Sequence, residues 1–170
     1  TIVEMAKKEG YTSVISSLDK DLMQLVEDPS VSMINTMTNK RFNEKEVIEK
    51  FGVKPSQIRD MLALVGDTSD NIPGVPKVGQ KTAAKWLNEF GDLESIKENA
   101  YAIKGVVGDN LRNALDVLDR NISLVSLKKD VDIHVKIEDL LTLNPDDDEL
   151  NKIFSELEFA TVKNNDEKSK

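Results

Sequence analysis

Residues 66–83 read GDTSDNIPGVPKVGQKTA, and this stretch decides more about the fold than any other part of the chain. Two carboxylates, Asp67 and Asp70, come first, and their spacing predicts that both lie on one helical turn and face one ion. A loop rich in proline and glycine follows, and after it a helix begins that carries Lys81 and Thr82. This order predicts a pair of metal ligands beside a backbone surface that can hold a phosphate.

The loop Gly74–Gly79, GVPKVG, is predicted to form a tight hairpin. Glycine lets a backbone approach another backbone or a phosphate closely. Gly79 precedes a helix whose first amides lack intrahelical acceptors, which favours an anion, and Lys81 and Thr82 add a charge and a hydroxyl. Such contacts position a nucleic acid without reading its sequence. The alternative interpretation is a plain tight loop between two packed helices.

A second pair of acids, Asp19 and Asp21, lies in the segment 16–26, SSLDKDLMQLV. The pair follows a predicted strand, at the edge where open α/β sheets place their ligands. Two acid pairs at element boundaries favour a two-metal site, in which ions about 4 Å apart clamp the attacking and leaving oxygens of a phosphodiester. The alternative for both pairs is that the acids cap helices or stabilise turns.

Composition narrows the class of protein. The 170 residues suit one domain, and 39% hydrophobic with 32% charged residues predicts a soluble, helix-rich globule. The absence of cysteine excludes disulfides, zinc thiolate sites and cysteine nucleophiles, and fits a reducing cytoplasm. With His134 as the single histidine, metal cages and triads built on histidine are excluded. No apolar run approaches the roughly 20 residues of a membrane span.

The net charge of −8 has the wrong sign for a nucleic-acid binder, so any such binding must depend on local charge. A basic strip is present locally at Lys77, Lys81 and Lys85. The bulk negative charge predicts weak, salt-sensitive non-specific binding.

Hydrophobic periodicity predicts a helix-rich α/β fold, with a strand–helix–strand order that makes the edge of a parallel sheet. The chain begins inside a helical pattern without an N-cap, which indicates a piece of a longer protein. The predicted strands are 12–17 and 31–35, the predicted helices are 19–26, 43–51, 57–65, 79–90, 93–99, 107–119 and 147–157, and Ile122–Val135 is predicted to be extended.

Three segments resemble the 5′ nuclease family, which includes flap endonucleases and the 5′→3′ exonuclease domain of bacterial DNA polymerase I. Residues 66–87, GDTSDNIPGVPKVGQKTAAKWL, are similar to the family's helix–three-turn–helix, a helix-hairpin-helix-like element. Residues 16–26 resemble its strand and metal-binding acids, and VSMINTMTNKRF at 31–42 is similar to the polymerase I version. The similarity runs from residue 1 to about residue 162.

The resemblance implies a function and its residues. Asp19 and Asp21 match ligands of the catalytic metals, Mg²⁺ or Mn²⁺, and Asp67 and Asp70 match the acids of the second metal position. No catalytic residue separate from these ligands is implied. The hairpin matches a loop that contacts duplex backbone and can seat K⁺ on its carbonyls. The implied DNA-binding residues are Gly74, Val75, Lys77, Val78, Gly79, Lys81, Thr82 and Lys85.

The implied activity is metal-dependent phosphodiester hydrolysis at 5′ flaps and nicks of double-stranded DNA, in primer removal and repair. A monomer in the bacterial nucleoid, without a membrane partner, is expected. The implied organisation has residues 1–36 as part of an α/β metal-binding core, residues 37–162 as the DNA-binding helical subdomain, and residues 163–170 as a linker stub.

Two departures from the family pattern carry expectations. Lys77 stands where the family often has glycine, so a positive φ there would strain the lysine or turn it toward a phosphate. The family's N-terminal part, with further metal ligands and a basic arch, has no counterpart in the sequence, so these 170 residues alone are expected to be inactive or nearly so.

Two other classes of function stay open from the residues. A non-catalytic helix-hairpin-helix module would bind duplex DNA equally well with or without Mg²⁺. A protein-interaction scaffold, favoured by the acidic surface, would bind no DNA even at low salt.

Overall fold

Two short hydrophobic runs build a small sheet in the first part of the chain. In this computed structural model β1 (Ser13–Ser16) pairs in parallel with β2 (Val31–Asn35), and β2 pairs antiparallel with β3 (Lys40–Phe42). Ile15 lies opposite Met33 in the register, and Met33 is fully buried. The parallel pair that the sequence predicted is therefore confirmed, and β3 adds a short antiparallel strand that was not predicted.

The structure describes residues 1–159 and divides the chain into two units, Thr1–Asp132 and Ile133–Lys170. The predicted linker stub at 163–170 lies outside the described residues. The helices of the first unit are α1 (Ile2–Lys8), the 3-10 helices η1 (Lys20–Leu25) and η2 (Pro55–Gln57), α2 (Glu44–Phe51), α3 (Ile58–Val65), α4 (Gln80–Phe90), α5 (Leu93–Glu98), α6 (Val106–Asn113) and α7 (Leu115–Val125). The second unit contains the 3-10 helix η3 (Ile137–Asp139) and α8 (Asp147–Glu156).

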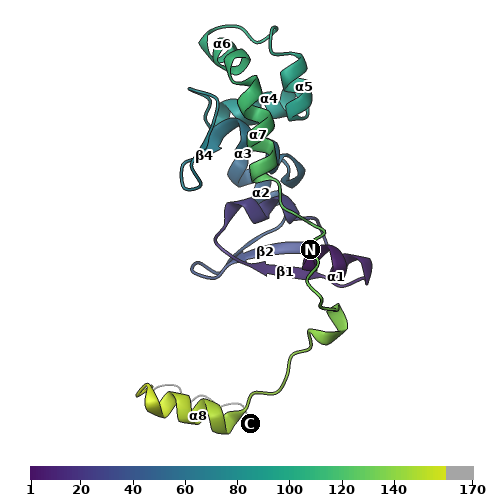
Figure 1. Ribbon diagram of the computed structural model, residues 1–170, viewed down its shortest axis with the longest axis vertical. Helices are drawn as coiled ribbons and strands as arrows, with labels where there is room; N and C mark the ends of the chain where they lie inside the picture. Colours follow the sequence, from purple (N-terminus) through teal and green to yellow (C-terminus); the bar gives the residue numbers. More distant parts are fainter. Residues whose placement is uncertain (160–170) are drawn as a thin grey trace. The chain divides into compact units, whose positions relative to one another are not determined.

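Helix α3 is the centre of the hydrophobic core of the first unit. Five of its eight residues are buried hydrophobic ones, and the helix packs against α4, α5, α7 and η1. Figure 1 shows α7 running alongside α3, with the sheet of β1 and β2 on the other side of α2. Because η1 also packs on α3, the residues after β1 are brought next to the end of α3.

Between α3 and α4 the chain makes a two-stranded hairpin, β4 (Gly66–Asp67) and β5 (Ile72–Pro73), in which Asp67 lies opposite Ile72. Two glycines make this connection possible. Gly66 has a φ of +78°, and a Cβ on it would lie 2.3 Å from the amide nitrogen of Gly74. A Cβ on Gly74 would lie 2.0 Å from the carbonyl oxygen of Val65. The two backbone segments therefore cross at a distance that only glycine allows.

Polar caps set the ends of several helices where the sequence predicted them. Asn43 and Glu46 form a capping box at the start of α2, and Gly52 ends that helix in the left-handed conformation. Asp92 caps α5 by accepting from the amide of Ser95.

The helix predicted at 19–26 is present as a 3-10 helix over Lys20–Leu25, with Asp19 and Val26 as its caps. Three other predictions about local structure were wrong. The expected helix 107–119 is two helices, α6 and α7, that meet at Ala114. The extended segment predicted at 122–135 begins inside α7, where Ile122 packs on the core and Val125 is buried, and no strand is found among its residues. Asp67 and Asp70 lie on the β4–β5 hairpin and not on a helical turn.

Among residues 1–159, no helix has both the length and the apolar character that crossing a membrane requires.

Candidate metal centre and nucleic-acid interface

Three carboxylates gather where η1 meets the β4–β5 hairpin. Asp21 comes from η1, Asp67 from β4, and Asp70 from the turn that follows β4. Each offers one oxygen, and the three oxygens all lie within 4.8 Å of one another. The structure thus brings Asp21 next to two acids that lie more than forty residues later in the sequence, as a shared cation site would require.

Asp67 is the most buried of the three, with a side chain only 5% exposed. The Lys20 ammonium lies 2.7 Å from its Oδ2, and the hydroxyl and amide of Ser69 donate to its Oδ1 at 2.5 and 3.0 Å. The hydrogen bond from Lys20, followed by those from Ser69, lowers the pKa of Asp67 to about 2. Asp67 is therefore a carboxylate at every physiological pH.

Asp21 is in a different environment. Its Oδ1 is buried and accepts no hydrogen bond from any described residue. Burial first, and then the negative charges of Asp19 and Asp67, raise the pKa of Asp21 above its usual value. A buried carboxylate oxygen without a donor, among other acids, is costly unless a cation approaches it. The all-oxygen donor set and this orphaned oxygen fit a hard divalent ion.

Asp19 is exposed and caps η1, because its Oδ1 accepts the amide hydrogen of Asp21 at 2.9 Å. It lies outside the group of three oxygens, although its charge acts on Asp21. The structure therefore gathers three of the four predicted metal ligands and gives the fourth a capping bond.

The hairpin Gly74–Gly79 buries its two valines and exposes the residues between them. Val75 and Val78 are buried in the core, 3% and 5% exposed, so their side chains face away from solvent. Lys77 between them is exposed and has a φ of +64°, the left-handed conformation considered in the sequence analysis. The backbone of Lys77 is therefore strained, and its exposed side chain extends away from the core.

Helix α4 begins directly after this hairpin. Gly79 is its N-cap and supplies no side chain, and its carbonyl accepts from the amides of Thr82 and Ala83. The amides of Gln80 and Lys81 have no acceptor among the described residues, which leaves two donors at the positive end of the helix dipole. Lys81 and Lys85 are exposed on this helix, and Thr82 is half-buried.

The basic strip has no acidic partners in the described part of the chain. No carboxylate there lies within 4.0 Å of the Lys77, Lys81 or Lys85 ammonium. Three unpaired ammonium groups and two free amides can attract phosphates.

Sequence reasoning missed three residues that shape this region. Lys20 stands between the two acids of D-K-D, so its position was a usable signal, and Ser69 stands between Asp67 and Asp70. Asn121 carried no signal. It is completely buried on α7 and donates to the carbonyls of Ala63 at 3.1 Å and Pro73 at 2.5 Å. These two hydrogen bonds connect the β4–β5 hairpin with α3 and α7.

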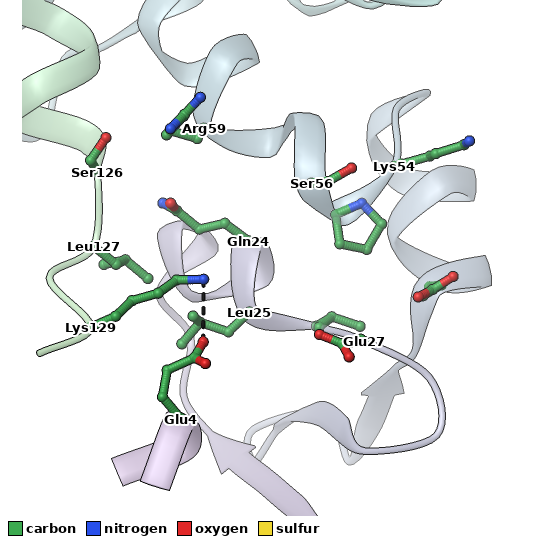
Figure 2. A pocket seen from close by; sticks show the side chains of 13 residues that line it. Glu4, Gln24, Leu25, Glu27, Lys54, Ser56, Arg59, Ser126, Leu127 and Lys129 are labelled. Atoms are coloured by element: carbon green, nitrogen blue, oxygen red, sulfur yellow. Dashed lines mark ion pairs between the residues drawn. The ribbon is translucent and has the colours of Figure 1, made fainter. Parts of the chain in front are cut away.

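A separate pocket of about 570 Å³ lies on another part of the first unit and contains none of the predicted site residues (Figure 2). Its charges are largely compensated, since Lys129 pairs with Glu4 at 3.2 Å and Arg59 pairs with Asp60 at 3.0 Å. Three acidic and three basic side chains line it, so the pocket selects no single class of charged ligand.

Comparisons with known proteins agree with this geometry. The family described as 5′-3′ exonuclease, C-terminal SAM fold, matches residues 53–149. DNA polymerase I of Mycobacterium tuberculosis H37Rv is 40% identical over 169 residues, which cover 96% of this chain and 18% of that protein. A 5′-3′ exonuclease of Aquifex aeolicus is 38% identical over 161 residues, which cover 95% of this chain and 54% of that protein.

Solved structures of phage proteins share the fold. A mutant of the T5 5′-exonuclease superposes with a TM-score of 0.68 at 28% identity, covering 73% of this chain and 51% of that one. A bacteriophage T5 flap endonuclease variant, in a pseudo-enzyme-product complex with DNA and metal ions, superposes with a TM-score of 0.67 at 27% identity, covering 73% and 46%.

The chain spans less than a fifth of the DNA polymerase I relatives and about half of the Aquifex and phage proteins. The family model nevertheless covers more than half of the chain, and the helix-rich α/β fold is the one that the sequence predicted. The resemblance stated from the sequence is confirmed, and the chain belongs to the 5′-3′ exonuclease family.

Proposed function

We propose that this chain forms the metal-binding edge and the DNA clamp of a 5′ nuclease, the 5′→3′ exonuclease domain of a bacterial DNA polymerase I. Its reaction would be phosphodiester hydrolysis at 5′ flaps and nicks of duplex DNA, in primer removal and repair. The observation that carries the proposal is the acid cluster of Asp21, Asp67 and Asp70 directly before the Gly74–Gly79 hairpin. The β4–β5 hairpin carries two of the acids, and the loop that follows it would be the surface for phosphates.

The acids would hold Mg²⁺ or Mn²⁺ as a two-metal site. Asp21, Asp67 and Asp70 would supply oxygens directly, and Asp19 would join them as the fourth predicted ligand. When bound, divalent ions supply the charge that activates water and stabilises the leaving oxygen of a phosphodiester. The protein's part is to keep Asp67 ionised through Lys20 and Ser69, and to present the orphaned oxygen of Asp21.

The hairpin would bind the DNA backbone through peptide groups rather than through its valines. Buried Val75 and Val78 fix the loop, Gly74 allows the crossing that sets its position, and Gly79 leaves open space where a Cβ would stand. Carbonyls of the loop would be the seat for K⁺. Beyond the loop, Lys77, Lys81, Thr82 and Lys85 would contact phosphates, which positions the duplex without selecting a base sequence.

We expect the 170 residues alone to cleave slowly or not at all. The acid cluster found among residues 1–159 has three members, and the family resemblance implies further metal ligands and a basic arch that have no counterpart in this sequence. The division into a core at residues 1–36 and a helical subdomain from residue 37, the monomeric state and action on chromosomal DNA in the nucleoid also stay predictions.

The test is binding and cleavage of a labelled 5′-flap duplex at low salt, with Mg²⁺, Mn²⁺ or EDTA. Beside the wild type runs the double variant Asp67→Asn/Asp70→Asn, and as a charge-matched control Glu98→Gln/Asp116→Asn, whose exposed acids lie on α5 and α7. We expect flap binding that Mn²⁺ strengthens in the wild type and in the control but not in the double variant.

Each of the other outcomes would favour a different function or contradict one part of the proposal. Metal-dependent cleavage that is lost in the double variant would support the nuclease and overturn the expected inactivity. Binding that ignores metal in every variant would indicate the non-catalytic duplex-binding module. No binding of DNA at low salt would leave only the protein-interaction scaffold.

A further inference from the structure

A groove of about 520 Å³ lies beside the basic face of α4, outside the hairpin. One wall comes from α4 and the other from the loop between α5 and α6 and the start of α6. The residues that carry its chemistry are Lys81 and Lys85 on α4, Lys104 on the loop, and the floor residues Phe90, Ile103 and Val107.

Its charge is strongly one-sided for so acidic a chain. Lys81, Lys85 and Lys104 all line the groove, and none has a carboxylate partner within 4.0 Å in the part of the chain that the structure describes. Glu89 is the one acid among the lining residues. In the pocket of Figure 2, by contrast, Lys129 is paired with Glu4. Three unpaired ammonium groups in one groove favour a ligand that carries several negative charges.

The floor of the groove is apolar and fixed. Phe90, Ile103 and Val107 are half-buried and pack on the core, and Trp86 beside them is only 4% exposed. A buried tryptophan cannot offer its face to a base, so the groove is not a stacking platform. An apolar floor between basic walls suits a sugar–phosphate strand, whose sugars lie against carbon while its phosphates meet lysine.

The loop that carries Lys104 is held in place from behind. Arg112 on α6 donates to the carbonyls of Ala100 at 2.6 Å and Ile103 at 3.1 Å. Gly108 lets α6 approach this loop, because a Cβ there would lie 1.9 Å from the Ile103 carbonyl oxygen. Two residues that do not line the groove thus set where Lys104 stands, and the basic wall is part of the built structure.

We propose that this groove is a second backbone-binding site, in which Lys104 binds phosphates of the duplex beyond those held by the hairpin. The inference deepens the proposed function and depends on it, because the ligand is the same DNA. Lys81 and Lys85 belong to both sites, since α4 runs from the hairpin into the groove. Lys104 belongs to the groove alone and is therefore the residue that separates the two.

The experiment measures the affinity of the 170-residue chain for flap duplexes with Ca²⁺ in place of Mg²⁺, across a salt series and with duplex arms of increasing length. Four proteins are compared: wild type, Lys104→Gln, Lys81→Gln, and the control Lys45→Gln, whose exposed lysine pairs with Glu49 on α2. Circular dichroism melting checks that the four proteins fold alike.

We expect Lys104→Gln to lower the magnitude of the salt slope by about 0.9, the value for one phosphate contact. When salt rises from about 50 to 200 mM, the factor by which the affinity falls should be roughly 3 times smaller for Lys104→Gln than for the wild type. The wild type should gain affinity as the arm is extended, and Lys104→Gln should lose that gain while keeping its affinity for the shortest duplex.

The inference is overturned if Lys81→Gln weakens binding while Lys104→Gln matches Lys45→Gln in affinity, salt slope and arm dependence. That result would leave the proposed function intact. If the wild type binds no duplex at low salt, the proposed function itself fails, and the groove loses its ligand with it.

Discussion

At Asp67, three hydrogen bonds converge on a carboxylate that a metal ion would also need. Lys20 reaches Oδ2 at 2.7 Å, while the hydroxyl and the amide of Ser69 both reach Oδ1. Each carboxylate oxygen accepts about two hydrogen bonds, so Oδ2 is the oxygen with room for a further partner. A cation that binds Oδ2 of Asp67 therefore lies close to the Lys20 ammonium, which repels it.

Replacing Lys20 with methionine should strengthen metal binding and weaken the fold. Loss of the ammonium removes a competing positive charge from Oδ2, so the Mn²⁺ dissociation constant should fall, and the free energy of unfolding without metal should drop by about 1 kcal/mol, since Lys20 is 41% exposed and screened. Mn²⁺ titration by electron paramagnetic resonance and urea unfolding measure the two effects. Lys45→Met is the control, and an unchanged or weaker Mn²⁺ affinity in Lys20→Met would contradict the prediction.

The low pKa of Asp67 predicts how stability changes in acid. Because the pKa is lowered from its usual 3.8 to about 2, the stabilisation by Asp67 is complete above pH 3.8 and is lost as the pH falls through about 2. Between pH 5 and pH 2 the wild type should therefore lose about 1–2 kcal/mol more unfolding free energy than Asp67→Asn, after allowance for screening at Lys20. Urea unfolding of both proteins at several pH values gives the difference, and parallel curves would count against the ion pair.

At the scale of elements, the hairpin between α3 and α4 is the part that joins the two halves of the site. The carbonyls at the end of α3 are taken by partners outside the helix, since Val75 donates to Leu64 at 2.8 Å and Asn121 donates to Ala63. Asn121 also holds Pro73, so α7, α3 and β5 are tied at one buried side chain. The metal ligands and the DNA loop therefore depend on the same backbone crossing.

A methyl group at that crossing should be severely destabilising. Gly74→Ala places a Cβ 2.0 Å from the Val65 carbonyl oxygen, and the main chain must move to accept it, which should cost roughly 3 kcal/mol or more of unfolding free energy. Gly79→Ala is the matched control, because its φ is −103° and nothing lies within 4 Å of its added Cβ. That control should lose at most about 1 kcal/mol, as expected for alanine at an N-cap.

Chemical denaturation of Gly74→Ala and Gly79→Ala measures the two losses of unfolding free energy. The prediction fails if Gly74→Ala is no less stable than Gly79→Ala. Mn²⁺ affinity should follow the same order, because a shifted crossing moves Asp67 and Asp70 relative to Asp21.

At the scale of the whole molecule, a net charge of −8 coexists with a local basic surface. Affinity for DNA should depend on the number of phosphates contacted and not on the sum of charges. With contacts from Lys77, Lys81, Lys85 and Lys104, the slope of log Kobs against log salt should lie between about −3 and −4.

Neutralising acids far from the basic surface in the sequence tests whether net charge affects DNA affinity. Asp147→Asn/Asp148→Asn changes the net charge by two at the start of α8, in the second unit, and should leave the slope unchanged. Equilibrium binding across a salt series measures it. A slope that steepens by one or more in this variant would mean that total charge controls binding.

The sequence predicted those parts of this molecule that local chemistry determines. Asn43 begins α2 through its capping side chain, Gly52 ends it because glycine tolerates a positive φ, and the parallel pair followed from two short hydrophobic runs. The segment after residue 121 was misjudged because the β-branched Ile122 and Val125 favour strands, yet packing on the core keeps them in α7. Tertiary contacts that join distant residues carry no local pattern.

The same division holds within the candidate site. The spacing D-x-x-D identified Asp67 and Asp70 but assigned them to the wrong kind of turn, because the pattern alone does not reveal the glycine crossing. D-K-D named Asp19 and Asp21 without separating the capping acid from the clustered one. Asn121 lies 48 residues from Pro73, so its role was invisible until the chain was folded.

The inward orientation of Val75 and Val78 determines which methods can detect the hairpin's role. Shortening either valine empties a packed site, so a mutational scan would score these two residues as elements of stability and nothing else. Among the described residues, no acceptor takes the amides of Lys77 and Gly79, whereas the amides of Val75 and Val78 are bonded within the chain and Pro76 has no amide hydrogen. Amide-to-ester replacement at residues 77 and 79 removes those two donors one at a time and would map recognition that resides in the main chain itself.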